Sequence, residues 1–193
     1  MTADYPSSIH HATRVRRSFA FVDLCGFTDF AESHGDDAAV AELTVLRATV
    51  RESASDLAVR VDKWLGDGVM LIGVEPEPLV EAVVTVEAGF RQRGHLLLRG
   101  GLATGEVILL EGADYVGRSV NLAARLCDRA EPGQVLAADE GLALPPSVKS
   151  GPAVPMEVAG FADPVLVVAL TRTDPAESAW PEGGAEARPR SAI

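Results

Sequence analysis

Two β-rich runs in the middle of the chain, Leu57–Leu65 and Val69–Val74, are separated only by Gly66-Asp67-Gly68. An Asp-Gly pair between two such runs indicates a tight turn between antiparallel strands. An isolated hairpin is at best marginally stable in water, because two strands have too little apolar surface to bury against each other. The rest of the chain must therefore supply the strands and helices that cover this hairpin.

The flanking segments are predicted to form those elements. The aromatic and β-branched run Ser18–Leu24 predicts a strand, and apolar residues at helical spacing predict a helix over Asp37–Ser55. After the hairpin we expect, in order, a helix from Pro76 to about Arg93, strands at Leu96–Ala103 and Glu106–Leu110, a helix at Arg118–Ala130, and closing strands at Gln134–Ala137 and Val165–Leu170. This order is typical of an α+β domain, in which helices pack on one mixed sheet.

The length of 193 residues suits one domain with additional terminal segments. We expect a flexible N-terminal segment over residues 1–17 and the folded domain over residues 18–173. Residues 174–193 are rich in Pro, Glu, Ala and Gly, which predicts a disordered tail.

Charge and hydropathy argue against several classes of partner. A net charge of −11 argues against binding to a nucleic-acid backbone, although a local cluster of cations can still hold a small anion. No run approaches the about 20 apolar residues of a membrane span, so we expect no membrane partner. Cys25 and Cys127 have no CxxC spacing, and the chain starts without the apolar stretch of a signal peptide, which favours a cytoplasmic location.

Two aspartates lie at the ends of predicted strands. Asp23 follows apolar residues near the end of its strand, where a buried charge needs a partner. Gly26-Phe27-Thr28 follows and leads towards a helix, whose first backbone N–H groups suit phosphate oxygens. Taken singly, Asp23 also fits a helix cap or a turn, and Asp67 also fits an ordinary hairpin turn.

Lys63 is predicted to lie on an apolar strand face. Alternation with a period of two places it on the same side as Val59, Val61 and Leu65. An ammonium group on such a face needs a carboxylate or another acceptor. The alternative is that its long side chain reaches the surface near the end of the strand.

Asn121 and Arg125 are four residues apart and therefore share one face of a predicted helix. The alternative is a solvated surface pair, in which Asp128 is the partner of Arg125. Asp114 lies just before Tyr115, and taken singly it also fits a residue that forms a turn.

Taken together, these residues resemble the catalytic domain of the class III nucleotidyl cyclases, of the short-arm bacterial type. The resemblance runs from about Ser18 to Leu170 and is carried by five segments in order: Phe21–Thr28, Lys63–Gly68, Arg99–Gly105, Asp114–Gly117 and Val120–Arg125. It implies an α+β fold with a ferredoxin-like mixed sheet and packed helices.

The resemblance also implies a divalent-metal site and a substrate. Asp23 and Asp67 would hold two Mg²⁺ or Mn²⁺ ions, which suit hard oxygen ligands. Lys63 and Asp114 would read the base, favouring ATP over GTP, because guanine presents the opposite donor and acceptor pattern. The phosphates would be bound by the remaining substrate-binding residues, Gly26, Phe27, Thr28 and Arg99.

The implied activity is that of an adenylate cyclase, which forms 3′,5′-cyclic AMP and pyrophosphate from ATP. Asn121 would orient the ribose, and Arg125 would stabilise the charge that develops on the α-phosphoryl group. The family shares each site between two subunits, so a homodimer is implied. A catalytically silent cyclase-like module, which binds nucleotide or dimerises, is the alternative.

One position departs from the family pattern. Where the family often has a Lys or Arg that meets the terminal phosphates, this chain has Ala159. Arg16, Arg17 and Arg118 are the candidates to supply that cation.

Overall fold

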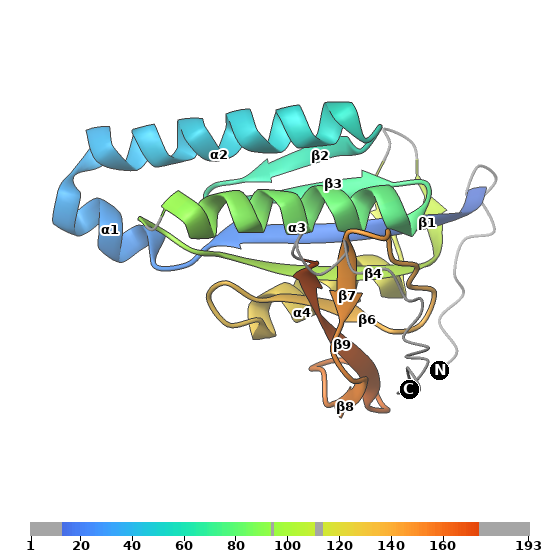
Figure 1. Ribbon diagram of the computed structural model, residues 1–193. Coiled ribbons are helices and arrows are strands. Elements are labelled where there is room, and N and C mark those ends of the chain that lie inside the picture. Colours follow the sequence, from blue (N-terminus) through green and yellow to red (C-terminus); the bar gives the residue numbers. More distant parts are fainter. Residues whose placement is uncertain (1–12, 94, 111–113, 174–193) are drawn as a thin grey trace, which may run out of the picture.

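The computed structural model describes residues 13–93, 95–110 and 114–173. Within these ranges the chain forms four helices and one nine-stranded mixed sheet (Figure 1). In chain order the elements are β1 (Thr13–Leu24), α1 (Phe27–His34), α2 (Asp36–Asp56), β2 (Arg60–Leu65), β3 (Gly68–Gly73), α3 (Pro76–Arg93), β4 (Leu98–Leu109), β5 (Tyr115–Val116), α4 (Arg118–Arg129), β6 (Val135–Ala138), β7 (Val148–Ser150), β8 (Val154–Met156) and β9 (Val165–Arg172). The expected α+β class is confirmed.

The centre of the sheet is the pair β1 and β4. They run antiparallel in register from Thr13 opposite Leu109 to Leu24 opposite Leu98. The strands are ordered β2-β3-β1-β4-β6-β9-β7, with β5 on β4 and β8 on β9. β6 lies parallel to β4, whereas the other pairs are antiparallel. The sheet is therefore mixed, with its longest pairing in the middle.

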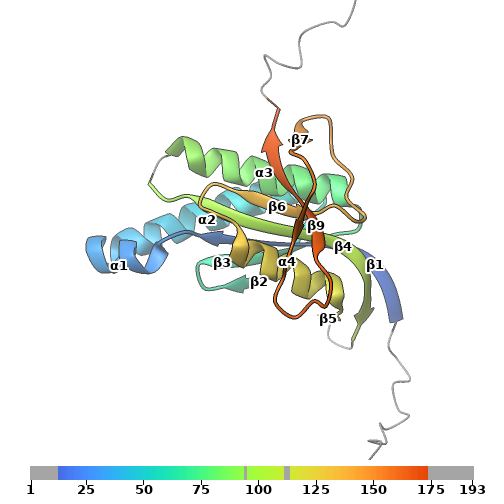
Figure 2. The ribbon, with the colours of Figure 1, turned by 90° about the horizontal axis from the view of Figure 1, so that it is seen from below.

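Alternation along β1 divides the apolar side chains between two cores. Ala20, Val22 and Leu24 are buried with residues of α2 and α3, whereas Phe19 belongs to the core that α4 covers. Figure 2 shows the central strands lying between α3 on one side and α4 on the other. Successive side chains of a strand point to opposite faces, so one apolar strand serves both cores.

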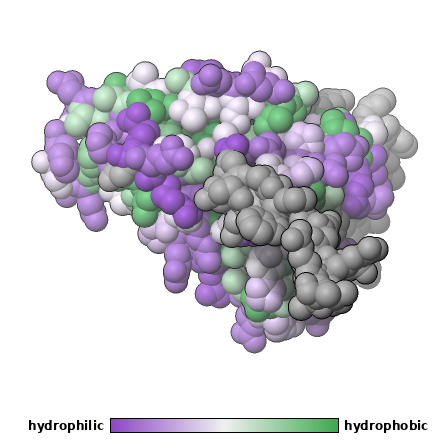
Figure 3. Space-filling view, viewed as in Figure 1, coloured by the Kyte–Doolittle hydropathy of each residue, from purple (hydrophilic) through white to green (hydrophobic). Residues whose placement is uncertain are grey.

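The helices expose their other sides to solvent. On α2, Leu46, Val50 and Ala54 are four residues apart and buried, as expected for an amphipathic helix. Hydrophilic and hydrophobic side chains are interspersed over the outer side of α1 and α2 (Figure 3). Among the described residues, no helix is both long enough and apolar enough to cross a membrane.

Gly101 brings α4 directly against β4. A Cβ atom at this position would lie 2.1 Å from the backbone nitrogen of Cys127 and 2.3 Å from the carbonyl oxygen of Ala123. These are backbone atoms of the helix and cannot rotate away. The close approach sets the position of α4, and with it the side chains on its outer face.

The structure corrects several expected boundaries. The two strands expected at Leu96–Ala103 and Glu106–Leu110 form the single strand β4, because Thr104 and Gly105 stay paired with β1 instead of turning. β1 begins at Thr13, so the domain boundary expected after residue 17 comes too late.

Helix α1 was not predicted, whereas α3 has the expected bounds and α4 ends one residue before its expected end. Residues 1–12 of the N-terminal segment expected to be flexible lie outside the described residues, and so does the expected tail 174–193.

Replacing Gly101 with alanine tests the contact between α4 and β4. We expect Gly101→Ala to lower the free energy of unfolding by about 3 kcal/mol or more, because the backbone of α4 must move. Gly89→Ala is the matched control, since no atom lies within 4 Å of a Cβ there. In a helix interior that change should stabilise the protein by about 0.5–1 kcal/mol. Equal urea midpoints for the two variants would contradict the packing described here.

Candidate active site

Asp23 and Asp67 lie next to each other at one end of the sheet. Asp23 is opposite Gly68 in the β1–β3 pairing, and Asp67 lies in the turn between β2 and β3. The backbone N–H of Leu24 donates to the carbonyl oxygen of Asp67, at 3.4 Å. Partial burial raises the pKa of Asp67, and the negative charge of Asp23 raises it further. A cation between the two carboxylates would relieve this repulsion.

Arg99 lies opposite Asp23 on β4 and holds its carboxylate. Its Nε and Nη2 donate to the same oxygen, Oδ2, at 3.0 and 2.7 Å, and Nη1 donates to the carbonyl oxygen of Asp128 at 3.4 Å. The hydrogen bond to Asp23 raises the pKa of Arg99. The other oxygen, Oδ1, would lie 3.2 Å from a Cβ at Gly68, so any side chain at that position would crowd the carboxylate.

An open pocket of about 300 Å³ adjoins this carboxylate end, and Asp23, Leu65, Arg99 and Asp128 contribute to its lining. The carboxylate oxygens of Asp23 and the neighbouring Asp67 are of the kind that suits Mg²⁺ or Mn²⁺, which bind oxygen ligands. In the described ranges no three His, Cys, Asp or Glu side chains are grouped to hold a metal ion. The protein therefore offers a partial coordination sphere, and phosphate and water oxygens would have to complete it.

The predicted phosphate-binding segment leads from this end of β1 into α1. Gly26 has φ 75° and is the N-cap residue of α1, which begins at Phe27. Its positive φ is a conformation that glycine adopts without steric cost. The first N–H groups of a helix, including that of Thr28, have no partner within the helix and can donate to an anion.

Lys63 lies on the opposite face of the sheet from Val61, with which it was predicted to share a face. Val61 pairs with Leu71 and Lys63 with Met70, so Asp62 is an extra residue in a β-bulge. The bulge breaks the period of two. Trp64 consequently packs towards α2, and Lys63 lies on the α4 side, opposite Met70.

The carboxylate partner expected for Lys63 is Asp114, with which it forms an ion pair. Tyr115 packs edge-on against Phe19 of β1, at 5.5 Å between ring centres, and so holds the segment of Asp114 over the α4 face. The hydrogen bond from Lys63 to Asp114 raises the pKa of the lysine. Both side chains are about half exposed, at 49% and 60%, so the pair remains accessible to a ligand.

Asn121 and Arg125 share one face of α4, as predicted, and line an open pocket of about 620 Å³. Arg118 lies on the same helix face, and the segment from Ala159 to Phe161 forms the opposite wall. The alternative partner of Arg125 is also present, because its Nη1 lies 3.5 Å from Oδ2 of Asp128. Both of those side chains are more than half exposed, so this long contact leaves Arg125 free to donate elsewhere.

The predicted residues thus do not form one closed site: two clusters lie apart, and the ion pair of Lys63 and Asp114 lines neither of the two pockets. Asp23, Asp67 and Arg99 lie at the carboxylate end, whereas Asn121 and Arg125 line a second pocket, and Ala124 borders both. Sequence reasoning missed Phe161, over whose ring the guanidinium of Arg118 lies at 4.3 Å. No local pattern could have revealed this contact, because it joins two segments that only the fold brings together.

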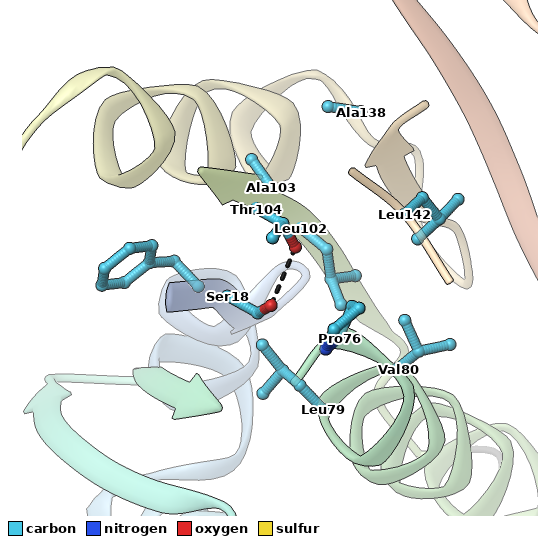
Figure 4. A pocket seen from close by; sticks show the side chains of 10 residues that line it. Ser18, Pro76, Leu79, Val80, Leu102, Ala103, Thr104, Ala138 and Leu142 are labelled. Carbon is cyan, nitrogen blue, oxygen red and sulfur yellow. Dashed lines mark hydrogen bonds between the residues drawn. The ribbon is translucent and has the colours of Figure 1, made fainter. Parts of the chain in front are cut away.

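Two other features do not provide a reactive site. Burial raises the pKa of the Cys127 thiol to about 12, so it stays protonated at neutral pH. In a separate pocket of about 10 Å³, the hydroxyl groups of Ser18 and Thr104 point towards each other and lie 2.8 Å apart (Figure 4). That volume holds about one water molecule and no larger ligand.

Sequence comparison finds relatives in mycobacteria. The uncharacterized protein Rv2212 of Mycobacterium tuberculosis is 36% identical over 151 residues, which make up 78% of this chain and 40% of that protein. The pH-sensitive adenylate cyclase MT1302 of the same species is 37% identical over 124 residues, 62% of this chain and 30% of that protein. The chain therefore spans less than half the length of these relatives. No protein-family model matches the chain.

Structural comparison finds cyclase catalytic domains. The adenylyl cyclase CyaB from P. aeruginosa is similar with a TM-score of 0.69 and 25% identity, over 85% of this chain and 97% of that chain. The guanylyl cyclase Cya2 is similar with a TM-score of 0.68 and 21% identity, over 85% and 96% of the two chains. The fold, the order of the site segments along it and these similarities identify the chain as a member of the class III nucleotidyl cyclase family, whose catalytic domain it contains.

Proposed function

We propose that this protein is an adenylate cyclase, which converts ATP to 3′,5′-cyclic AMP and pyrophosphate at sites shared by two copies of the chain. The observation that carries the proposal is the separation of the two clusters, each of which is open and incomplete. A symmetric dimer that brings the carboxylate cluster of one copy to the α4 pocket of the other would complete two equal sites.

The proposed reaction is an in-line displacement at the α-phosphorus. The ribose 3′-oxygen forms a bond to this phosphorus and loses its proton to solvent, while the bond to the β-phosphate oxygen breaks and pyrophosphate leaves. Asp23 and Asp67 would hold two Mg²⁺ or Mn²⁺ ions. When bound, these ions supply charge stabilisation for the attacking oxygen and for the phosphates.

The remaining residues would bind and orient the nucleotide. Gly26, Phe27 and Thr28 would donate backbone N–H groups to phosphate oxygens. Asn121 would hold the ribose hydroxyls, and Arg125 would donate to the α-phosphoryl oxygens, whose negative charge increases in the transition state.

The choice of ATP rests on the ion pair of Lys63 and Asp114. An ammonium group can donate to an acceptor nitrogen of adenine, and a carboxylate can accept from its 6-amino group. Guanine has a carbonyl oxygen at position 6 and a protonated neighbouring nitrogen, which reverses both requirements. We place the activity in the cytoplasm, with neither nucleic acid nor membrane as a partner.

A turnover assay tests this function. Purified protein with Mn²⁺ should convert ATP to cyclic AMP, with a higher kcat/KM for ATP than for GTP. Asp67→Ala should reduce kcat by about 100-fold or more, because it removes one of two carboxylates that hold the metal ions. A preference for GTP would refute the roles of Lys63 and Asp114. ATP binding without turnover in either metal would establish the alternative, a silent cyclase-like module.

Mixing two inactive variants tests whether the sites are shared. Asp67→Ala and Arg125→Ala chains should each be inactive alone. Each mixed dimer would have one site with both changes and one site with none. After random subunit exchange, half of the dimers are mixed, so about a quarter of the wild-type activity should return. Mass spectrometry confirms that the subunits have exchanged. If no activity returns after that exchange, the sites are not shared.

A further inference from the structure

The α4 pocket has a local charge opposite to that of the whole protein. Arg118 and Arg125 both line it, and no carboxylate side chain does so among the described residues. The chain as a whole has a net charge of −11. A concave surface that gathers two guanidinium groups on an acidic protein is suited to a small anion with several negative charges.

Arg118 is held in this pocket by an aromatic ring. Its guanidinium carbon lies 4.3 Å from the centre of the Phe161 ring, within the range of a cation–π contact. In the described parts of the chain, no carboxylate lies within ion-pair distance of Arg118. Stacking covers one face of the planar group but leaves the N–H groups at its edge free to donate.

The spacing along α4 places this cation relative to the other site residues. Arg118, Asn121 and Arg125 follow one another at intervals of three and four residues, so all three lie along one helix face. Arg125 lies seven positions after Arg118, which corresponds to about 10 Å along the helix. A ligand whose α-phosphate meets Arg125 has its other charged groups within reach of the long side chain of Arg118.

We propose that Arg118, held by Phe161, binds the β- and γ-phosphates of the nucleotide and the pyrophosphate product. The proposal rests on the function proposed above and adds a phosphate-binding residue to it. Ala159 borders the same pocket and has no side chain that could bind phosphate. Arg118 would be the residue that offsets this missing cation, and Phe161 would be a positioning residue.

Arg16 and Arg17 are poorly placed for this role. Arg16 lies seven residues before Asp23 on β1, about 23 Å along the strand. Its Nη2 would lie 2.5 Å from a Cβ at Gly141, which places its guanidinium group in the loop after β6. Arg17 donates through Nη1 to the carbonyl oxygen of Arg16. Neither arginine lines the carboxylate or the α4 pocket.

Binding of α,β-methylene-ATP tests the proposal without turnover, because this analogue cannot release pyrophosphate. With Mn²⁺ present, we expect Arg118→Gln to weaken its binding by about 10- to 100-fold, the effect of losing a charged hydrogen-bond donor. AMP lacks the β- and γ-phosphates, so its binding should change less than about 2-fold. Isothermal titration calorimetry of wild-type and variant dimers measures both ligands.

Two further sets of variants separate phosphate binding from other causes. Arg16→Gln makes the same change of charge on β1 and should leave both affinities unchanged. Phe161→Leu should weaken binding of the analogue but not of AMP, and Phe161→Tyr, which keeps the ring, should restore it. In turnover, Arg118→Gln should raise the inhibition constant of inorganic pyrophosphate by a similar factor.

The outcomes distinguish this proposal from the proposed function. Equal binding of the analogue by wild type and Arg118→Gln overturns it, even if the wild type forms cyclic AMP. Equal weakening of the analogue and of AMP also overturns it, because the effect would then lie in the nucleoside site or the fold. Selective weakening of the analogue supports it, even if the wild type does not cyclise ATP, in which case only the proposed function fails.

Discussion

The pairing of β1 with β4 determines where the functional groups lie. Its register places Asp23 opposite Arg99, so the carboxylate has a cationic partner before any metal ion binds. One and two residues further along β4, Gly100 and Gly101 leave room for elements packed on the two faces of the sheet. Because Gly101 allows α4 to approach so closely, a single strand pair positions both the carboxylate end and the helix that carries Asn121 and Arg125.

Two exposed ion pairs among the candidate site residues contribute little to stability. Lys63 and Asp114 are both exposed, and Arg125 and Asp128 are exposed and far apart for an ion pair. Surface pairs of this kind are screened by water and salt. Each pair presents charged groups at an accessible surface, where they can meet a ligand. The apolar cores on the two faces of the sheet provide the stability that lets these polar groups remain open to solvent.

The sequence predicted the elements well where local signals decide them. Pro76 marks the start of α3, and the Asp-Gly turn marks the hairpin of β2 and β3. The prediction of secondary structure failed where pairing between distant strands overrides the local preference of the residues. Thr104 and Gly105 resemble a turn but remain in β4, because β1 pairs with them along its whole length. The bulge at Asp62 has no sequence signal, and it places Lys63 on the face opposite to that of Val61.

The candidate site was predictable in its members but not in its arrangement. The order of the motifs indicated Asp23, Asp67, Asn121 and Arg125 together, yet only the fold shows that Asp23 lines one pocket whereas Asn121 and Arg125 line another. The contact between Arg118 and Phe161 depends on the path of the chain between α4 and β9. Such long-range contacts have no periodic or local pattern from which they could be predicted.

A crystal structure of the protein with α,β-methylene-ATP and Mn²⁺ would show whether two copies share each site. We expect a symmetric dimer in which each nucleotide lies between Asp23 and Asp67 of one copy and Asn121 of the partner subunit. A nucleotide surrounded by residues of a single copy, in the crystal and in a monomer that remains active in solution, would contradict it.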